Sequence, residues 1–132
     1  MNTLKYHHTG LLVENIDESL GHYIKVFGAE NISEIYSVSS QGVRVCFIKN
    51  GEESHIELVE PVGEESVVYN LLKKRTSYYH LGYKVKDIHA AIESLEELNY
   101  KAMELFRSEA FGGNLCVFLY TPDAHLIELI ED

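Results

Sequence analysis

Residues 8–20 read HTGLLVENIDESL, and residues 80–92 read HLGYKVKDIHAAI, which repeats the first stretch at an offset of 72. Both stretches contain the pattern His-x-Gly-x-x-Val-x-(Asn/Asp)-Ile. Similarity at a fixed offset is the sequence signature of an internal repeat and has to be recognised before single elements are assigned. The chain is therefore predicted to contain the same structural unit twice.

Two further matches extend the repeat toward the end of each half, now at an offset of 71. The segment GVRVCFI, residues 42–48, aligns with GNLCVFL, residues 113–119. In the same way HIELVE, residues 55–60, aligns with LIELIE, residues 126–131. Matches in the same order at a nearly constant offset are hard to obtain by chance, so the repeat covers both halves of the chain.

The alignment pairs two histidines and two glutamates. His8 aligns with His80, and Glu57 aligns with Glu128, whereas His7 has no histidine at the equivalent position. Successive side chains of a strand point to opposite faces, so only one of two adjacent histidines can point into a common interior. We expect His8 to be that residue.

Each repeat has the same order of expected elements. A strand, at about 5–13 or 78–86, leads into an amphipathic helix that begins after Asp17 or Asp87 as its N-cap. Three strands follow in each repeat, so the unit is βαβββ and the predicted fold class is α+β. The expected later strands are residues 31–38, 43–49 and 54–60 in the first repeat, and 101–106, 114–120 and 125–131 in the second.

Composition narrows the class of protein. The 132 residues are one domain's worth, and 45% hydrophobic residues suffice for a proper core. A net charge of −10 repels phosphate backbones, which argues against a nucleic-acid partner. No signal-peptide pattern opens the sequence, and no apolar run approaches the roughly 18 residues of a membrane span. We expect a cytoplasmic protein without a membrane partner, with Cys46 and Cys116 buried as inert thiols.

The paired glutamates lie in apolar strands. Alternation places Glu57 on one strand face with His55 and Val59, and Glu128 is in similarly apolar company. A lone buried carboxylate is costly and normally persists only when it is paired or bound to a metal. Taken singly, each glutamate is more simply explained as solvated and each histidine as a core residue. The repeat argues against that explanation for all four residues together.

Repeat-equivalent positions would converge if two similar sheets curve toward each other. Convergence brings together two imidazoles, from His8 and His80, and two carboxylates, from Glu57 and Glu128. Such a mixed nitrogen and oxygen set suits one divalent first-row metal ion and leaves positions open for water or substrate. These donors accept Co, Ni, Zn, Mn or Fe, so the sequence does not distinguish the metal.

Over essentially its whole length the chain resembles the vicinal oxygen chelate superfamily. The resemblance implies a glyoxalase-like fold, in which two tandem βαβββ modules form a cupped mixed sheet with helices on the outside. Within the superfamily the ligand pattern His, Glu or Gln, His, Glu belongs to glyoxalase I and methylmalonyl-CoA epimerase, and here it falls on His8, Glu57, His80 and Glu128. The implied organisation is a single domain over residues 1–132, with module one at about 4–60, a linker helix at about 61–76 and module two at about 77–132.

The segment between the modules favours the epimerase branch. Residues 42–75, GVRVCFIKNGEESHIELVEPVGEESVVYNLLKKR, are similar to the epimerase pattern of Gly-Val, Glu-Leu-x-x-Pro-x-Gly and a short helix. By resemblance the protein is a metal-dependent epimerase or isomerase that abstracts the α-proton next to a thioester carbonyl, with Glu128 and Glu57 as candidate bases. Two features depart from that pattern: no glutamate follows the Gly-Val closely, and the loop before the last strand is short.

Two other functions stay open. One is a glyoxalase I-like lactoylglutathione lyase, which shares the ligand pattern. The other is a small-molecule or antibiotic-binding protein without catalysis, although such members of the superfamily typically lack the metal ligands. The resemblance implies an acyl-CoA or thiol adduct as the small-molecule partner and a homodimer as the assembly. Lys84 and His55 are further candidates for substrate binding, because each shares a strand face with a proposed ligand.

Overall fold

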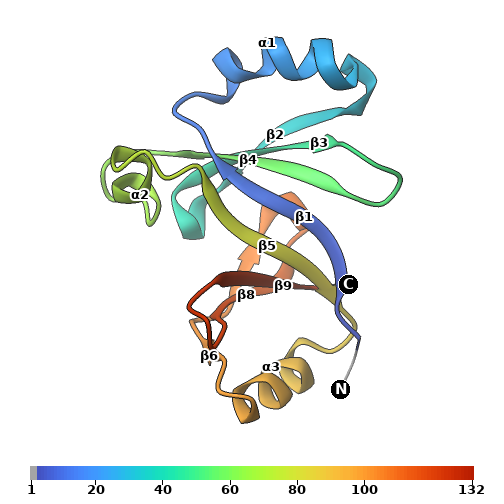
Figure 1. Cartoon of the computed structure of the whole chain (residues 1–132), viewed down its shortest axis with the longest axis vertical. Helices are drawn as coiled ribbons and strands as arrows, with labels where there is room; N and C mark the ends of the chain where they lie inside the picture. The colour runs from blue at the N-terminus through green and yellow to red at the C-terminus, as the bar shows by residue number, and fades with distance from the viewer. Residues whose placement is uncertain (1–2) are drawn as a thin grey trace. The chain divides into compact units, whose positions relative to one another are not determined.

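The computed structural model describes residues 3–132 and has an α+β architecture, as predicted (Figure 1). By the contacts between its residues the chain divides into two compact units. The first unit runs from His8 to Tyr79, and the second joins the segment that ends at His7 to residues 80–132. Residues 1 and 2 of the predicted domain lie outside the described residues, and the predicted module boundaries stay a proposal.

The first unit contains a four-stranded mixed sheet with one long helix. Its strands lie in the order β2-β3-β4-β1, with β1 parallel to β4 and the other pairs antiparallel. A five-residue loop, 50–54, joins β3 to β4. The elements in chain order are β1 (Lys5–Leu12), α1 (Ile16–Phe27), β2 (Ile32–Val38), β3 (Val43–Lys49), β4 (His55–Pro61) and α2 (Tyr69–Lys73).

The second unit repeats this order with one difference. Strand β5 is parallel to β9, β9 is antiparallel to β8, and β8 pairs on its other side with both β6 and β7. The single strand predicted at about 101–106 is therefore two short strands, separated by residues 103–105. The elements in chain order are β5 (Tyr78–Val85), α3 (Ile88–Glu97), β6 (Lys101–Ala102), β7 (Phe106–Ser108), β8 (Asn114–Tyr120) and β9 (Leu126–Glu131).

In the first unit α1 covers one face of the sheet (Figure 1). The contacts bury one set of alternating strand residues, with Ile56 and Leu58 of β4 on this face. Glu57 and Val59 consequently point to the opposite face. The packed residues are Ile16, Leu20, Tyr23 and Phe27 from the helix and Ile35, Cys46, Ile48, Ile56 and Leu58 from the strands.

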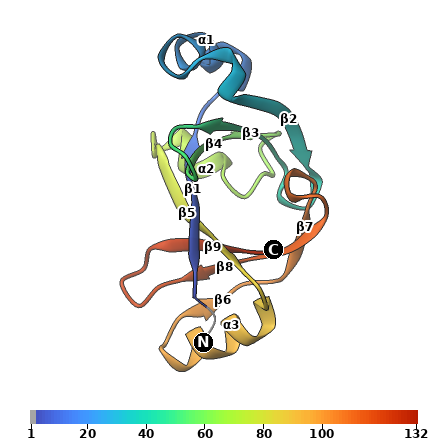
Figure 2. The same ribbon diagram turned by 90° about the vertical axis from the view of Figure 1, so that its right-hand side faces the viewer.

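In the second unit α3 covers one face of its sheet in the same way, and Figure 2 shows it beside β6 and β8. Ile127 and Leu129 of β9 point toward the helix, so Glu128 points away from it. Each helix thus leaves the glutamate face of its sheet uncovered. The packed residues are Ile88, Ala91, Ile92 and Leu95 from the helix and Val85, Val117, Leu119, Ile127 and Leu129 from the strands.

The two helices begin with different caps. Asp87 is the N-cap of α3 as predicted, and its Oδ1 accepts a hydrogen bond of 3.0 Å from Ala90 N. The prediction of Asp17 as the cap of α1 is wrong, because Asn15 takes that place and its Oδ1 accepts from Glu18 N at 3.0 Å. Asn and Asp cap helices about equally well, so residue type alone does not decide between Asn15 and Asp17.

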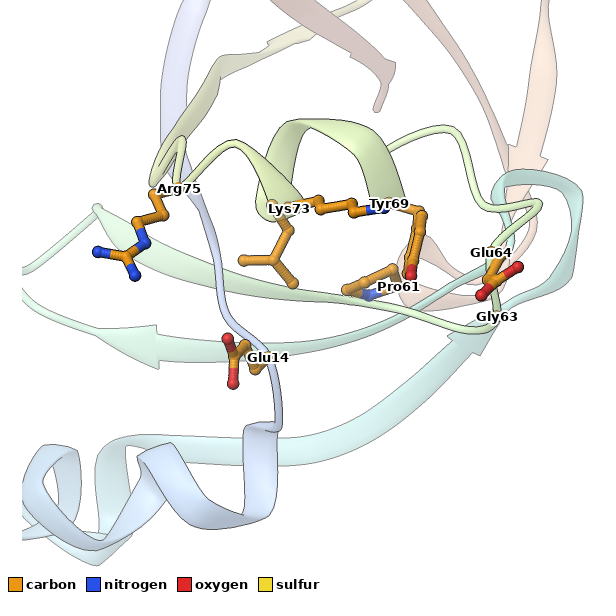
Figure 3. Close-up of a pocket in the computed structure, with 8 residues that line it drawn as sticks. Glu14, Pro61, Gly63, Glu64, Tyr69, Lys73 and Arg75 are labelled. Carbon is orange, nitrogen blue, oxygen red and sulfur yellow. The ribbon is translucent and has the colours of Figure 1, made fainter.

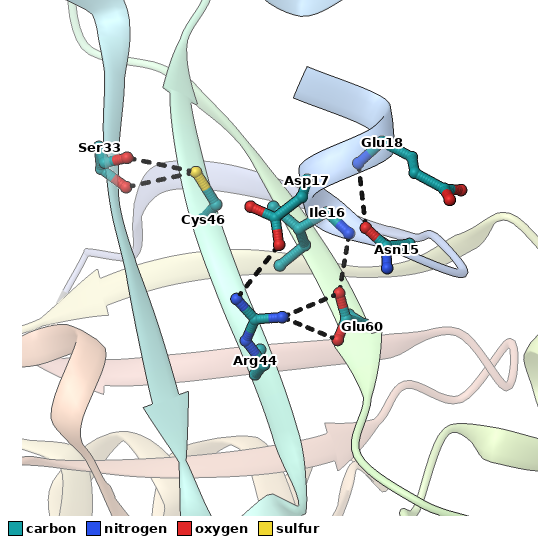
Figure 4. A network of polar contacts seen from close by, with 8 residues as sticks. All are labelled: Asn15, Ile16, Asp17, Glu18, Ser33, Arg44, Cys46 and Glu60. Carbon is teal, nitrogen blue, oxygen red and sulfur yellow. Dashed lines mark hydrogen bonds and ion pairs between the residues drawn. The ribbon is translucent and has the colours of Figure 1, made fainter. Parts of the chain in front are cut away.

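A glutamate at the end of the last strand of each unit also holds a helix start. In the first unit Glu60 Oε1 accepts a hydrogen bond of 2.8 Å from Ile16 N, and the same carboxylate pairs with Arg44 Nη1 at 3.1 Å (Figure 4). In the second unit Glu131 Oε2 accepts from Ile88 N at 3.0 Å. Both bonds satisfy backbone N–H groups that a first helical turn leaves without partners. They fix each helix to the strand that carries Glu57 or Glu128.

Cys46 and Cys116 are buried free thiols, as expected from the apolar runs that contain them. Among the described residues, no helix combines the length and the apolar character needed to cross a membrane.

Candidate metal centre

The first unit brings His8 of β1 and Glu57 of β4 together. Both side chains are buried, with 0% and 5% of their surface exposed. The parallel register places Glu57 beside Gly10, two residues beyond His8 on the same face of β1. His8 Nε2 lies 3.4 Å from Glu57 Oε1. The sequence prediction that His8 is an interior residue is therefore correct, whereas His7 is half-buried against the ring of Phe111.

The second unit builds the same pair from repeat-equivalent residues. His80 of β5 and Glu128 of β9 are 1% and 4% exposed. Glu128 lies beside Gly82 in the parallel register, and its Oε1 is 3.3 Å from His80 Nε2. Two separate units thus present one buried imidazole and one buried carboxylate each, in matching geometry.

The His-x-Gly motif has a physical explanation in this register. The glycine two residues after the histidine faces the same side of the sheet, next to the glutamate of the parallel neighbour strand. Glycine has no side chain, so the glutamate finds space there to extend toward the histidine.

Two phenylalanines complete the pairs and were not identified from the sequence. Phe47 of β3 is the antiparallel partner of Glu57, and its ring packs edge-on against His8 with centroids 5.8 Å apart. Phe118 of β8 is the partner of Glu128 and packs edge-on against His80 at 5.1 Å. The two phenylalanines align at the offset of 71, so the repeat itself carried the signal that could have identified them.

The atom separations within each pair suit a shared metal ion. A direct charge-assisted N–H···O bond is normally about 2.7–2.9 Å long, shorter than the 3.4 Å and 3.3 Å found here. Two donors bound to one tetrahedral ion at about 2.1 Å lie roughly 3.4 Å apart. Imidazole nitrogen and carboxylate oxygen are also ligands that divalent first-row metals accept. The chemistry and spacing of each pair therefore fit a metal site.

The two further candidates for substrate binding lie beside the pairs. His55 is half-buried on the same face as Glu57, and its ring lies 6.2 Å from that of Phe47. Lys84 shares the face of His80 and forms an ion pair of 3.8 Å with Asp132 Oδ1. Both positions agree with the alternation used to select them, and their contact with a substrate stays a proposal.

Comparison with known proteins identifies the superfamily of this chain. The family model described as the Glyoxalase/Bleomycin resistance protein/Dioxygenase superfamily matches residues 7–120. The chain belongs to this superfamily. A curated superfamily relative, the mitochondrial methylmalonyl-CoA epimerase of Dictyostelium discoideum, is 33% identical over 131 residues, which cover 96% of this chain and 78% of the relative.

Solved structures agree with the assignment to the superfamily. Methylmalonyl-CoA epimerase from Mycobacterium tuberculosis has a TM-score of 0.84 at 25% identity, covering 96% of this chain and 87% of that one. The hypothetical protein BH1468 from Bacillus halodurans C-125 has a TM-score of 0.83 at 28% identity, covering 98% and 95%. The predicted superfamily and glyoxalase-like fold class are confirmed, and these relatives support the predicted epimerase-like enzyme.

Proposed function

We propose that this protein is an epimerase that removes and returns the α-proton of 2-methylmalonyl-CoA or a closely related acyl-CoA. The observation that carries the proposal is the pair of buried His–Glu arrangements, built alike on β1 and β4 and on β5 and β9. The 33% identity to a methylmalonyl-CoA epimerase supports the choice of reaction. The pairs argue against a protein that only sequesters a small molecule, because such members of the superfamily typically lack the metal ligands.

In this proposal His8, Glu57, His80 and Glu128 together hold one divalent metal ion. The fit of each pair to a shared ion supports it, as does the repeat that places the same donors in both units. When bound, the metal acts as a Lewis acid that stabilises the negative charge developing on the carbonyl oxygen of the thioester. Which of Co, Ni, Zn, Mn or Fe is the native ion is left open.

The transfer of the substrate's α-proton is assigned to the carboxylates of Glu57 and Glu128. One glutamate, Glu128 or Glu57, takes the α-proton from one face of the substrate carbon, and the other, protonated beforehand, returns its proton to the opposite face. Each carboxylate would transfer its proton while detached from the metal, because a metal-bound carboxylate is a weak base. Repeat-equivalent carboxylates suit this task, because inversion requires an acid and a base on opposite sides of one carbon. Phe47 and Phe118 lie against the two histidines and limit how far their rings can turn. They hold the imidazoles in position and keep water from that side of each ring.

The test follows the α-proton of 2-methylmalonyl-CoA by proton NMR in deuterated buffer. Protein loaded with cobalt to a verified content should remove the α-proton signal far faster than the spontaneous rate. Glu128→Gln keeps the size of the side chain and one accepting oxygen but cannot take a proton, so exchange should fall at least about 100-fold. A signal that persists at the background rate despite full metal loading would refute the epimerase proposal.

Three predictions from the sequence accompany this proposal. A homodimer is expected by resemblance to the superfamily, and a cytoplasmic location from the composition. The small-molecule partner is expected to be an acyl-CoA or a thiol adduct, of which this proposal takes the acyl-CoA. The first is checked by the mass of the protein in solution and the second by fractionation of the cell.

A further inference from the structure

A pocket of about 470 Å³ lies in the first unit, between the short helix α2 and the ends of strands β1 and β4 (Figure 3). Half-buried Pro61, Tyr69 and Leu72 contribute apolar surface to its walls. Lys73 and Arg75 bring two positive charges to the same pocket. Such a combination is notable in a chain with a net charge of −10.

We propose that this pocket binds the phosphorylated adenosine end of an acyl-CoA. Aromatic and aliphatic side chains offer a surface against which a purine can stack. Lysine and arginine are the side chains that bind phosphate, arginine through two parallel hydrogen bonds. The inference rests on the proposed function, since it assigns the part of the substrate that lies far from the reacting carbon.

The place of the pocket along β4 agrees with the length of the substrate. Pro61 is on the same face of β4 as Glu57 and four residues further on, which corresponds to about 13 Å along a strand. The pantetheine arm between the thioester and the phosphates is comparable to about four residues of extended chain, or about 14 Å. An acyl-CoA whose thioester lies at Glu57 can therefore place its phosphates at this pocket.

The backbone at Arg75 has a conformation that a residue with a side chain rarely adopts. Arg75 has a φ of 62°, a left-handed conformation that follows a helix and usually belongs to glycine. The N–H groups of Arg75 and Thr76 donate to the carbonyls of Leu72 and Leu71 at 2.8 and 3.0 Å. Because the main chain already satisfies these carbonyls, the arginine is not required to cap the helix. Strained positions of this kind concentrate at functional sites.

The charges of Lys73 and Arg75 are not used elsewhere in the described part of the chain. Arg44 and Lys84 form ion pairs there, whereas no such pair engages Lys73 or Arg75. Glu64 also lines the pocket, and Figure 3 shows it at the end opposite Arg75. The phosphates are assigned to Lys73 and Arg75, the two cations that line the pocket.

Glu14, on the wall formed by the end of β1, is the second carboxylate of the pocket. A carboxylate accepts hydrogen bonds but cannot donate them, so it suits the ribose hydroxyl or the amino group of adenine. The acidic wall also disfavours a ligand that is a phosphate and nothing more. A nucleoside phosphate satisfies the apolar walls, the carboxylates and the cations together.

The direct test titrates the protein with adenosine 3′,5′-bisphosphate by calorimetry. The double variant Lys73→Gln/Arg75→Gly should bind this probe about tenfold more weakly, because it removes two exposed charge contacts. Lys74→Gln makes the same charge change beside the pocket, since Lys74 does not line it, and should leave the affinity unchanged. Equal affinity in the double variant, or no binding by the unaltered protein, would overturn the proposal.

Kinetics separate a failure of this inference from a failure of the proposed function. With 2-methylmalonyl-CoA the double variant should have a KM about tenfold higher at unchanged kcat. With the 2-methylmalonyl thioester of pantetheine, which lacks the phosphorylated adenosine end, KM should not change. If the double variant turns over 2-methylmalonyl-CoA with an unaltered KM, the proposed role of the pocket is refuted and the proposed epimerase function is not. The other outcome is that the unaltered protein turns over neither thioester while the double variant loses binding of adenosine 3′,5′-bisphosphate. That result refutes the proposed epimerase function and leaves the proposed role of the pocket standing.

Discussion

Arg75 has a strained backbone and is also proposed to bind the ligand. The effect of that strain on the free energy of unfolding can be measured separately from binding. Replacement by glycine should stabilise the fold by about 0.5–1 kcal/mol, because glycine adopts positive φ without the steric cost of a side chain. Urea denaturation measures the change. Lys74→Gly is the matched control, since its φ of −84° favours no glycine and the substitution should destabilise instead. A loss of stability in Arg75→Gly would contradict the strain argument.

Cys46 gives a second prediction for a single residue, concerning pH. Burial raises the pKa of its thiol, and the nearby Ser33 hydroxyl only partly offsets that rise. The unfolded chain therefore loses this proton at a lower pH than the folded one. The stability that the protonated thiol contributes is complete below about pH 8.5 and declines as pH rises through the folded pKa.

Denaturation between pH 7 and 9.5, with a reducing agent present, checks the Cys46 prediction. Unaltered protein should lose more stability over this range than Cys46→Ala, which has no thiol to titrate. The native thiol should also react with iodoacetamide many times more slowly than the thiol of the unfolded chain. Parallel pH profiles in the two proteins would contradict the assignment to Cys46.

At the scale of elements, the glutamates that end β4 and β9 attach each helix to its sheet. Glu60→Ala removes the acceptor for Ile16 N and the partner of Arg44, so it should cost about 1–2 kcal/mol. Glu131→Ala removes only the acceptor for Ile88 N and should cost about 1 kcal/mol. The shift of the denaturation midpoint measures both changes, provided that the dependence of the unfolding free energy on denaturant concentration keeps the same slope.

The matched control is Glu60→Gln. Its amide oxygen can still accept from Ile16 N, whereas its charge for Arg44 is lost, so the cost should lie below that of Glu60→Ala. If glutamine and alanine destabilise equally, the hydrogen bond to the helix start contributes nothing measurable. In that case the ion pair alone would explain the position of Glu60.

Elements were predictable from the sequence where the pattern was repeated. The repeat predicted the βαβββ order, and strand alternation predicted that Glu57 shares a face with His55 and Val59. In the structure this is the face away from α1. The start of α1 was not predictable, because Asn15 and Asp17 both qualify as caps and the choice depends on packing. The break within 101–106 was also missed, since no glycine or proline marks it.

At the scale of the whole molecule, the two kinds of site differ in how far the sequence reveals them. The His–Glu pairs were predictable because each residue has a repeat-equivalent partner. The pocket beside α2 has no such support, since Glu14, Pro61 and Arg75 come from separate segments that only the fold brings together. Of that pocket the sequence showed only the basic run at residues 73–75.

The last prediction concerns the metal that the two pairs are proposed to share. A ligand that binds only the folded state stabilises it by about 2.7 kcal/mol at 100 times its dissociation constant. Added zinc or cobalt should therefore raise the free energy of unfolding of the unaltered protein by an amount of this order. Because His8 lies in one unit and His80 in the other, His8→Ala and His80→Ala should each abolish the effect.

The exposed His125 provides the control for this comparison, because His125→Ala removes an imidazole that belongs to neither pair and should leave the metal effect intact. Denaturation curves with and without metal, after treatment with a chelator, compare the four proteins directly. A metal effect that survives in one of the two pair variants would mean that a single His–Glu pair holds the ion. That outcome would contradict the four-ligand site, since a site shared by both pairs loses its affinity whichever imidazole is removed.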